Sequence, residues 1–357
     1  MIYLISLATI VAFAGYAPQK YGLQQNNYKN YMILCGFLIA ALAGLRSYST
    51  GSPDTYAYTV NLERIGTYDN FRDYYDRYLD SNDFIFSEAG FYYCLWLLSR
   101  VTVNGHWLVF ISSAFITWAT CRFIYKNSSN APLSLMIYVC LGLFSFNMDC
   151  MRQSIAMSIC MLGYEYVKER KLIKFLIVVS LATLFHKSGI FFLPVYVLPI
   201  LKNTKGNWLM FMVALIAFVL SLDVLIPLFN DATNKAYATD SGLNHGGISV
   251  LLIYALTIVL TVAGNPLNNK KSLVAFCCVL ISIALYLSRY FAHRIVERAS
   301  FYYFYFTILY IPDAIDGLHE QDKKWVKPVF IMASLALFAY RIYVGLFKNF
   351  NLFFFRF

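Results

Sequence analysis

The sequence predicts an all-α polytopic membrane protein, built as a single integral membrane domain over residues 1–357. The chain is 59% hydrophobic and only 13% charged, with a mean hydropathy of +0.57, which is too apolar for a soluble domain of this length. Apolar runs able to cross about 30 Å of hydrocarbon recur along the whole chain, and each must be helical to satisfy its own backbone hydrogen bonds. We expect about 11–13 transmembrane helices.

The apolar runs set the order of the expected spans. They cover residues 2–16, 31–46, 106–124, 132–147, 150–167, 172–186, 188–201, 207–228, 248–264, 272–290, 299–312 and 327–346. The run from Phe91 to Val101 is only about 11 residues long, so we expect an interfacial or re-entrant helix there.

Short basic clusters between the apolar runs predict the orientation. The clusters lie at residues 168–171, 202–205, 270–271 and 323–327. Positively charged loops stay in the cytoplasm, which puts residues 46–89 outside as an extracytoplasmic helical segment between the second and third spans. Arg152, His186 and Arg294 fall on the same face. The net charge of +10 therefore reflects membrane orientation and does not indicate a nucleic-acid partner.

The segment 46–89 is polar and acidic, with eight Asp or Glu residues against four Arg and with interspersed tyrosines. Its Ser52-Pro53-Asp54 sequence is typical of a helix start, with Ser52 as the N-cap and Pro53 as the first helical residue. Asp54 would then lie in the first turn, where a carboxylate suits the helix dipole. Asp54 is therefore either a structural first-turn residue or a functional carboxylate.

Motifs of soluble enzymes are absent from the sequence. It contains no G-x-G-x-x-G motif after a strand, no Walker loop, no H-E-x-x-H and no G-x-S-x-G. None of the eight cysteines forms a C-x-x-C pair, so they are interpreted as small hydrophobic residues. We expect no cofactor and no metal site. The remaining candidates are ionisable residues at or inside apolar spans, where charges are costly and tend to be functional.

Arg152 opens an apolar span and has amide side chains near it, Asn147 and Gln153. An arginine at this depth could anchor the helix by extending to the interface. The neighbouring amide donors favour an anion-binding site instead.

His186 and Lys187 lie between two short apolar runs. The histidine is either a hydrogen-bonded structural group or a proton acceptor or phosphate donor, because its unperturbed pKa of about 6.5 allows both protonation states.

Three arginines, Arg289, Arg294 and Arg298, lead into an aromatic span that contains Tyr302. Arg298 and Tyr302 are four residues apart and share a helix face. The group is either an interfacial belt of arginine and tyrosine or a phosphate-binding cluster, since guanidinium forks match phosphate oxygens.

These residues, in this order, resemble the EpsG family of bacterial exopolysaccharide polymerases, which is similar in role to the Wzy-type polymerases. The matching elements are Arg46 with Gly51, Asp54, Thr55 and Tyr58; Glu88-x-Gly90-Phe91; Asn147 with Arg152-Gln153-x-x-Ala156; His186-x-Ser188 leading to Pro194; and the stretch from Arg294 to Tyr305.

The resemblance implies a glycosyltransferase of the GT-C kind in the bacterial cytoplasmic membrane. Such an enzyme takes a glycan from undecaprenyl pyrophosphate and joins it to the end sugar of a second lipid-linked repeat unit at the outer face. The implied partners are lipid-linked oligosaccharides, membrane lipids, and flippase and chain-length regulator proteins.

The chemistry of this transfer assigns roles to the candidate residues. Asp54, Glu88 and His186 are the candidates for activating the acceptor hydroxyl, in no order that the sequence settles. Fixed arginines would stabilise the departing pyrophosphate without a metal ion. The expected substrate-binding residues are Arg46, Tyr58, Arg152, Gln153, Lys187, Arg289, Arg294, Arg298 and Tyr302.

Two other functions fit part of the pattern. A flippase or transporter of lipid-linked sugars would also use arginines in a cavity, but internal repeats relating two halves are expected of it and none is visible. A membrane O-acyltransferase would need a catalytic histidine, for which His186 is the candidate.

The charge pattern makes a topological prediction. Asn70→Cys and Asn82→Cys, in a background without reactive native cysteines, should label from outside with a membrane-impermeant thiol reagent. Labelling that requires a breached membrane would reverse the orientation and remove the outer-face site.

Overall fold

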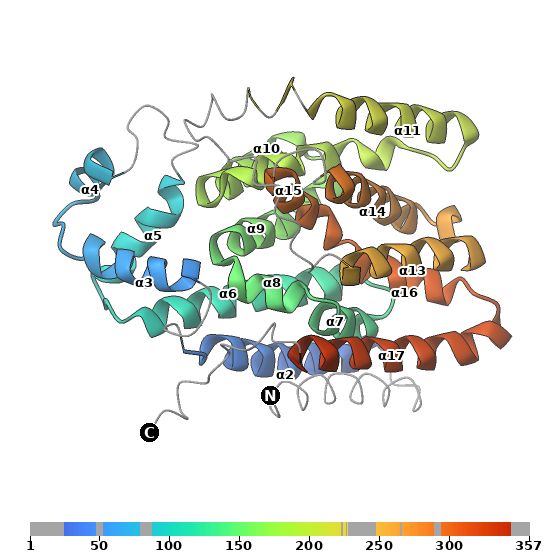
Figure 1. Cartoon of the computed structure of the whole chain (residues 1–357), viewed down its shortest axis with the longest axis horizontal. Helices are drawn as coiled ribbons and strands as arrows, with labels where there is room; N and C mark the ends of the chain where they lie inside the picture. The colour runs from blue at the N-terminus through green and yellow to red at the C-terminus, as the bar shows by residue number, and fades with distance from the viewer. Residues whose placement is uncertain are drawn as a thin grey trace.

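The computed structural model describes residues 25–47, 53–78, 88–222, 224–225, 227, 248–264, 266–288 and 294–343. The described residues contain helices and no strand, and most of the helices run side by side in one bundle (Figure 1). The expected span 2–16 lies outside the described residues. The all-α fold is confirmed, and the chain is a multi-pass helical membrane protein.

The amino-terminal half of the bundle is built from four straight helices. They are α2 (Gln25–Gly44), α6 (Gly105–Asn127), α9 (Met151–Lys168) and α10 (Leu172–Phe185). Helices α2 and α6 pack closely at glycines: a Cβ at Gly36 would lie 3.1 Å from Cys121 Sγ, and one at Gly44 would lie 2.8 Å from Phe110 Cδ2. These two contacts make α2 and α6 antiparallel neighbours.

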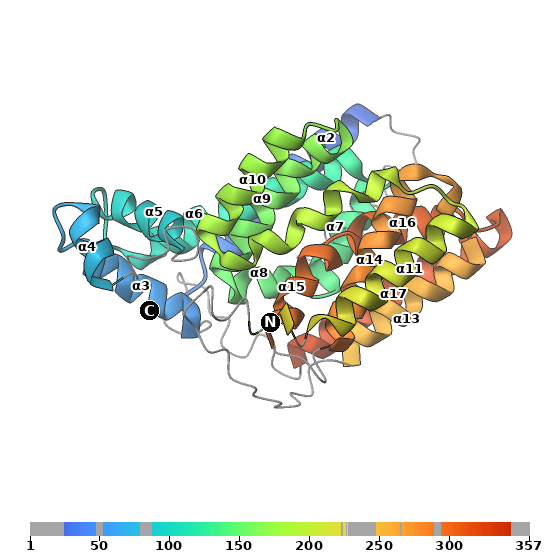
Figure 2. The same ribbon diagram turned by 90° about the horizontal axis from the view of Figure 1, so that it is seen from above.

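The carboxy-terminal half packs beside this group. It contains α11 (Lys205–Leu220), α13 (Ile248–Gly264), the short η4 (Pro266–Asn268), α14 (Lys270–Ser288) and α17 (Glu320–Tyr343). Viewed from above, α11, α13, α14 and α17 lie on one side of the molecule and α2, α9 and α10 towards the other (Figure 2).

Three expected spans are not single straight α-helices. Residues 132–147 form α7 (Ala131–Cys140) and α8 (Leu143–Asp149), bent by 53° where Gly142 adopts a φ of 106°. Residues 188–201 form the 3-10 helices η1 (Lys187–Tyr196) and η2 (Leu198–Ile200), in which Pro194 and Pro199 supply no backbone donor. Residues 299–312 divide into α15 (Arg294–Phe304) and α16 (Thr307–Asp316).

Few of the described helices are long enough to cross a bilayer alone. Three pass by length and composition, or four if α7 and α8 count as one span, and shorter apolar helices of 10–17 residues lie beside them. Several expected spans are divided by breaks, which explains part of the shortage of long helices. Hydropathy reflects burial in lipid and does not show where a helix bends.

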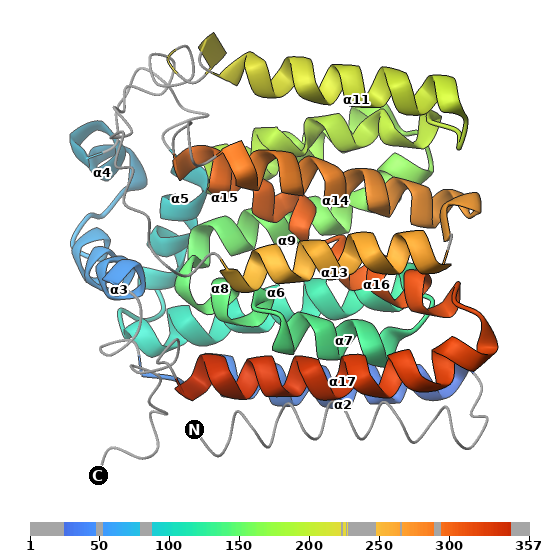
Figure 3. The same ribbon diagram turned by 45° about the vertical axis from the view of Figure 1, so that its right-hand side comes forward.

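Part of the polar segment after α2 forms two helices that cap one end of the bundle. Helices α3 (Pro53–Ile65) and α4 (Phe71–Tyr78) lie at this end, beyond the bundle helices (Figures 1 and 3). Helix α5 (Ala89–Ser99) packs against α3 and α10. Its 11 residues extend over about 16 Å, too short to cross the hydrocarbon.

A substitution at Gly163 on α9 tests how tightly α9 and α10 are packed. A Cβ at this position would lie 2.5 Å from Cγ1 of Val178 on α10, and a β-branched side chain has little rotamer freedom to move away. Gly163→Ala should therefore lower the free energy of unfolding by about 1–3 kcal/mol in detergent. Gly206→Ala, with nothing within 4 Å of the new Cβ, is the matched control. Equal stability of the two variants would contradict the packing.

Candidate functional site

A buried ion pair between Glu88 and Arg152 is the centre of the candidate site. Glu88 precedes α5 and Arg152 lies in the first turn of α9, and Arg152 Nη1 donates to Glu88 Oε2. Only 4% of the Glu88 side chain and 20% of the Arg152 side chain are exposed. Because both charges are largely removed from water, each requires the other as its counter-charge.

Aromatic rings hold the guanidinium of Arg152 in place. Its Nε donates to the Tyr58 hydroxyl at 2.9 Å. The guanidinium carbon lies 4.9 Å from the ring centroid of Tyr58, 5.7 Å from that of Phe91 and 5.9 Å from that of Tyr92. Such cation–π contacts orient a planar cation. The sequence-based interpretation did not include Phe91 and Tyr92 in the site, although they closely follow Glu88.

Tyr58 reaches the pair from α3, in the polar segment. Burial raises the pKa of its hydroxyl to about 12, against the opposing effect of the Arg152 charge. The phenol is therefore protonated at neutral pH. Since its oxygen accepts from Arg152, its own proton can be donated to a second acceptor.

Glu88 has a backbone conformation that ordinary residues rarely adopt. Its φ of 60° and ψ of 30° are left-handed, and a non-glycine residue held there is strained. Two residues later, Gly90 of α5 packs closely against α10: a Cβ at Gly90 would lie 2.9 Å from Leu184 Cβ. The close approach of α5 to α10 brings the carboxylate of Glu88 to the turn that begins at His186.

His186, Lys187 and Ser188 complete the surroundings of Glu88. The Lys187 N–H donates to Glu88 Oε1 at 3.4 Å, and His186 Nε2 lies 3.8 Å from the same oxygen. The Ser188 N–H donates to His186 Nδ1 at 3.3 Å, an arrangement that suits the neutral tautomer with its proton on Nε2, the nitrogen that faces Glu88. The Ser188 hydroxyl lies 2.6 Å from Nδ1 and 3.1 Å from the Tyr302 hydroxyl.

Helix α15 interacts with the site through the backbone carbonyl and the side-chain charge of Arg298. Gln153 Nε2 donates to the Arg298 carbonyl at 2.7 Å. The Arg298 side chain is exposed, and its positive charge acts on His186. Arg294 begins α15, but its side chain and the whole of Arg289 lie outside the described residues.

Asp54 and Arg46 lie beside this centre. Asp54 is in the first turn of α3, as expected, and is exposed, and its charge acts on Tyr58. Arg46 is buried and donates to the Ala43 carbonyl at 2.6 Å, to the Ser113 hydroxyl at 3.1 Å and to the Met148 carbonyl at 2.9 Å. Arg46 therefore ties the end of α2 to α6 and α8, and its contact with substrate stays a prediction.

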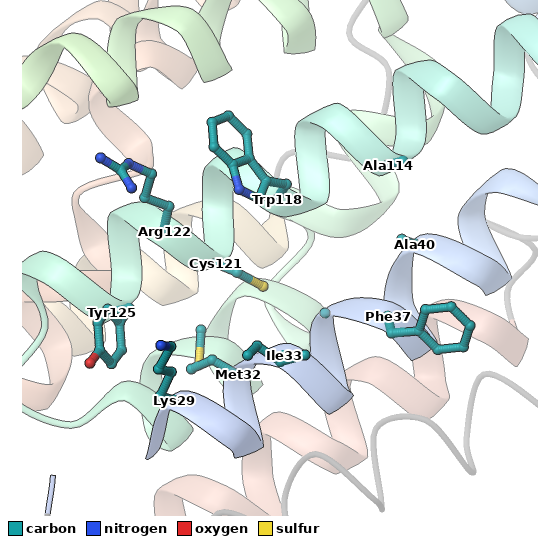
Figure 4. Close-up of a pocket in the computed structure, with 11 residues that line it drawn as sticks. Lys29, Met32, Ile33, Phe37, Ala40, Ala114, Trp118, Cys121, Arg122 and Tyr125 are labelled. Carbon is teal, nitrogen blue, oxygen red and sulfur yellow. The ribbon is translucent and has the colours of Figure 1, made fainter. Parts of the chain in front are cut away.

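Two cavities flank the bundle. One of about 280 Å³ lies among α5, α6, α9 and α10 and includes Phe91, one of the rings around Arg152. A larger one of about 440 Å³ lies between α2 and α6, where Lys29 and Arg122 accompany Ile33 and Trp118 (Figure 4). None of the predicted site residues lines the larger cavity, so it lies apart from the Glu88–Arg152 centre.

Comparison with known proteins decides the family. A model of the EpsG family matches residues 29–356, nearly the whole chain. The chain belongs to the EpsG family. No curated protein and no solved structure matches it.

EpsG is a family of exopolysaccharide polymerases, which confirms the resemblance and supports a polysaccharide polymerase-like role for this chain. The match extends well beyond the motifs that suggested it, since it also covers α11, α13, α14, α16 and α17. The roles of individual residues in this EpsG-family protein stay predictions.

The Glu88–Arg152 pair can be tested by stability. Glu88→Gln keeps an acceptor for the Lys187 N–H but leaves Arg152 without its counter-charge, so the free energy of unfolding should fall by about 1–3 kcal/mol. Glu165→Gln is the control, because Glu165 forms more exposed pairs with Lys126 and Lys168 and should cost less than about 1 kcal/mol. Denaturant unfolding in mixed micelles measures both, and equal losses would remove the pair from the centre of the site.

Proposed function

We propose that this EpsG-family protein polymerises a polysaccharide from lipid-linked repeat units at the outer face of the bacterial cytoplasmic membrane. The glycan on undecaprenyl pyrophosphate is transferred to the end sugar of a second lipid-linked unit, on a GT-C-like bundle. One observation carries the proposal: Arg152 is fixed by Glu88 and by aromatic rings beneath an acidic, tyrosine-rich cap, at the end of a membrane bundle.

The arginines stabilise the leaving group in this proposal. Arg152 uses Nε and Nη1 for Tyr58 and Glu88, which leaves Nη2 for a phosphate oxygen. Arg298, exposed on α15, and Arg294, the first residue of that helix, supply further guanidinium groups in this proposal. Negative charge accumulates on pyrophosphate as its bond to the anomeric carbon breaks, so these fixed cations lower the energy of the transition state more than that of the ground state.

Of the three candidates for activating the acceptor, Asp54 is the one exposed to an incoming sugar. Both oxygens of Glu88 already accept hydrogen bonds, Oε2 from Arg152 and Oε1 from the Lys187 N–H. His186 is buried, with Nδ1 accepting from the Ser188 N–H and Nε2 3.8 Å from Glu88 Oε1, so neither nitrogen faces an acceptor sugar. The carboxylate of Asp54 is exposed and close enough to Tyr58 for its charge to act on that hydroxyl.

The reaction then proceeds in one displacement. The acceptor hydroxyl gives its proton to Asp54, and its oxygen forms the new bond to the anomeric carbon of the donor sugar. The bond from that carbon to the phosphate oxygen breaks, and its electron pair leaves with the lipid pyrophosphate. Glu88 and His186 act as positioning residues for Arg152, and Tyr58 directs its hydroxyl proton to a substrate oxygen.

The hydrogen bonds of the His186 turn weigh against a membrane O-acyltransferase. That reaction needs a histidine with a basic nitrogen facing substrate, whereas His186 Nδ1 accepts from the Ser188 N–H. A flippase differs from a polymerase in its product, which is a moved lipid and not a longer glycan. Flippase and chain-length regulator proteins are the proposed partners of the polymerase.

The direct test is elongation by the purified protein. Incubation with a single lipid-linked repeat unit, without nucleotide sugar and in excess EDTA, should give a ladder of longer glycans, because fixed arginines supply the positive charge. Transbilayer movement without elongation would indicate a flippase. Activity lost in EDTA and restored by Mg²⁺ or Mn²⁺ would mean that a metal, and not arginine, holds the pyrophosphate.

The same assay tests the arginines. Arg152→Lys and Arg294→Lys keep the charge but lose the guanidinium fork, so turnover should fall by about 10²-fold or more while the protein still inserts and folds. Arg100→Lys is the control, because Arg100 lies at the end of α5, where it is exposed and donates to the Gly66 carbonyl. Normal turnover in both test variants would mean that Arg152 and Arg294 only anchor their helices at the membrane interface.

A further inference from the structure

The smaller cavity, of about 280 Å³, is almost wholly apolar. Helix α5 contributes Phe91 and Leu95, α6 contributes Leu108 and Ile111, α9 contributes Ile155, and α10 contributes Phe185. The hydroxyl of Ser112 is the one oxygen-bearing side chain among the described residues that line it. A cavity of this composition suits a hydrocarbon chain and does not suit a sugar.

This cavity adjoins the charged centre. Its Phe91 ring lies 5.7 Å from the guanidinium carbon of Arg152. Ile155 is three residues after Arg152 on α9 and so lies on the same side of that helix. On α10, the cavity residue Phe185 directly precedes His186 in the sequence. A molecule held by Arg152 would therefore have its adjoining apolar part in the cavity.

The cavity opens at the side of the bundle. Leu95 and Leu108 are buried, at 1% and 5% exposed, and form its inner wall. At the mouth, Cys94 is exposed and Ile111 is 50% exposed. In a membrane, exposed apolar residues on a spanning helix such as α6 face lipid, so a long chain can leave the cavity directly into the bilayer.

We infer that this cavity holds the isoprene units next to the pyrophosphate of the polyprenyl donor. The inference rests on the proposed function, which puts the donor pyrophosphate at Arg152. A volume of about 280 Å³ lies at the small end of ligand cavities, so the remaining units of the chain extend into the bilayer. Binding energy from this apolar part, remote from the reacting carbon, orients the pyrophosphate against the guanidinium.

A matched pair of substitutions tests the inference by kinetics. Ile111→Trp fills the mouth of the smaller cavity, whereas Ile33→Trp makes the same change at an exposed residue of the larger cavity. Ile111→Trp should raise KM for a long-chain polyprenyl donor by about tenfold or more and leave KM unchanged for a donor with a single isoprene unit. Ile33→Trp should change neither value. An unchanged KM for the long-chain donor in Ile111→Trp would overturn the inference.

Thiol labelling supplies a readout that does not depend on turnover. Undecaprenyl pyrophosphate without sugar should slow alkylation of Cys94 by a lipid-soluble maleimide and leave Cys121, which lines the larger cavity, unaffected. Inorganic pyrophosphate should protect neither cysteine. Equal protection of Cys94 by phosphatidylglycerol would show that the cavity takes any acyl chain and would overturn the inference.

The two proposals fail in different ways. Cys94 protection without elongation would support the prenyl site and reject the polymerase. Elongation would support the polymerase, but it would contradict the prenyl site if Cys94 were not protected and Ile111→Trp did not change KM.

Discussion

The carboxylate of Glu88 imposes the constraint on which the site depends. An ionised carboxylate that is 4% exposed requires nearby positive charge and hydrogen-bond donors, and two separate parts of the chain provide them. Helix α9 brings Arg152, and the turn after α10 brings the Lys187 N–H and the Nε2 of His186. Any rearrangement of α5, α9 or the His186 turn would expose this charge or leave it uncompensated.

Three breaks interrupt helices of the bundle. Backbone at membrane depth departs from straight α-helix only where protein or a cavity surrounds it. Each break lies next to a buried residue that forms a side-chain hydrogen bond: Asn147 follows the break at Gly142, Ser188 follows the one at His186, and Tyr305 lies between α15 and α16. Asn147 Nδ2 donates to the Tyr305 hydroxyl at 2.5 Å, which joins the first break to the third.

The placement of charge beside an apolar cavity gives the site an amphiphilic character. The cap of α3 and α4, with acidic and tyrosine side chains, reaches Arg152 through Tyr58, and the cavity with Leu95 and Ile155 reaches it through Phe91. Under the proposed function, polysaccharide assembly from lipid-linked units uses both surfaces, because one substrate molecule carries a sugar, a pyrophosphate and a hydrocarbon chain. In that proposal, the arginine binds where the polar and apolar parts of such a molecule meet.

Hydropathy by itself determined the class of fold and most of the helices, since burial in lipid depends on local composition. The expected span 248–264 coincides with α13, and 272–290 nearly coincides with α14. The order of the motifs also indicated the family, which the match over residues 29–356 confirms. Only the tertiary structure showed that Arg152 contacts both Glu88 and Tyr58 and that the rings of Phe91 and Tyr92 surround its guanidinium. It also showed that the Arg46 side chain joins the end of α2 to a neighbouring helix. Those contacts join residues far apart in the sequence, and they depend on how bent helices pack, which the composition of a single segment does not encode.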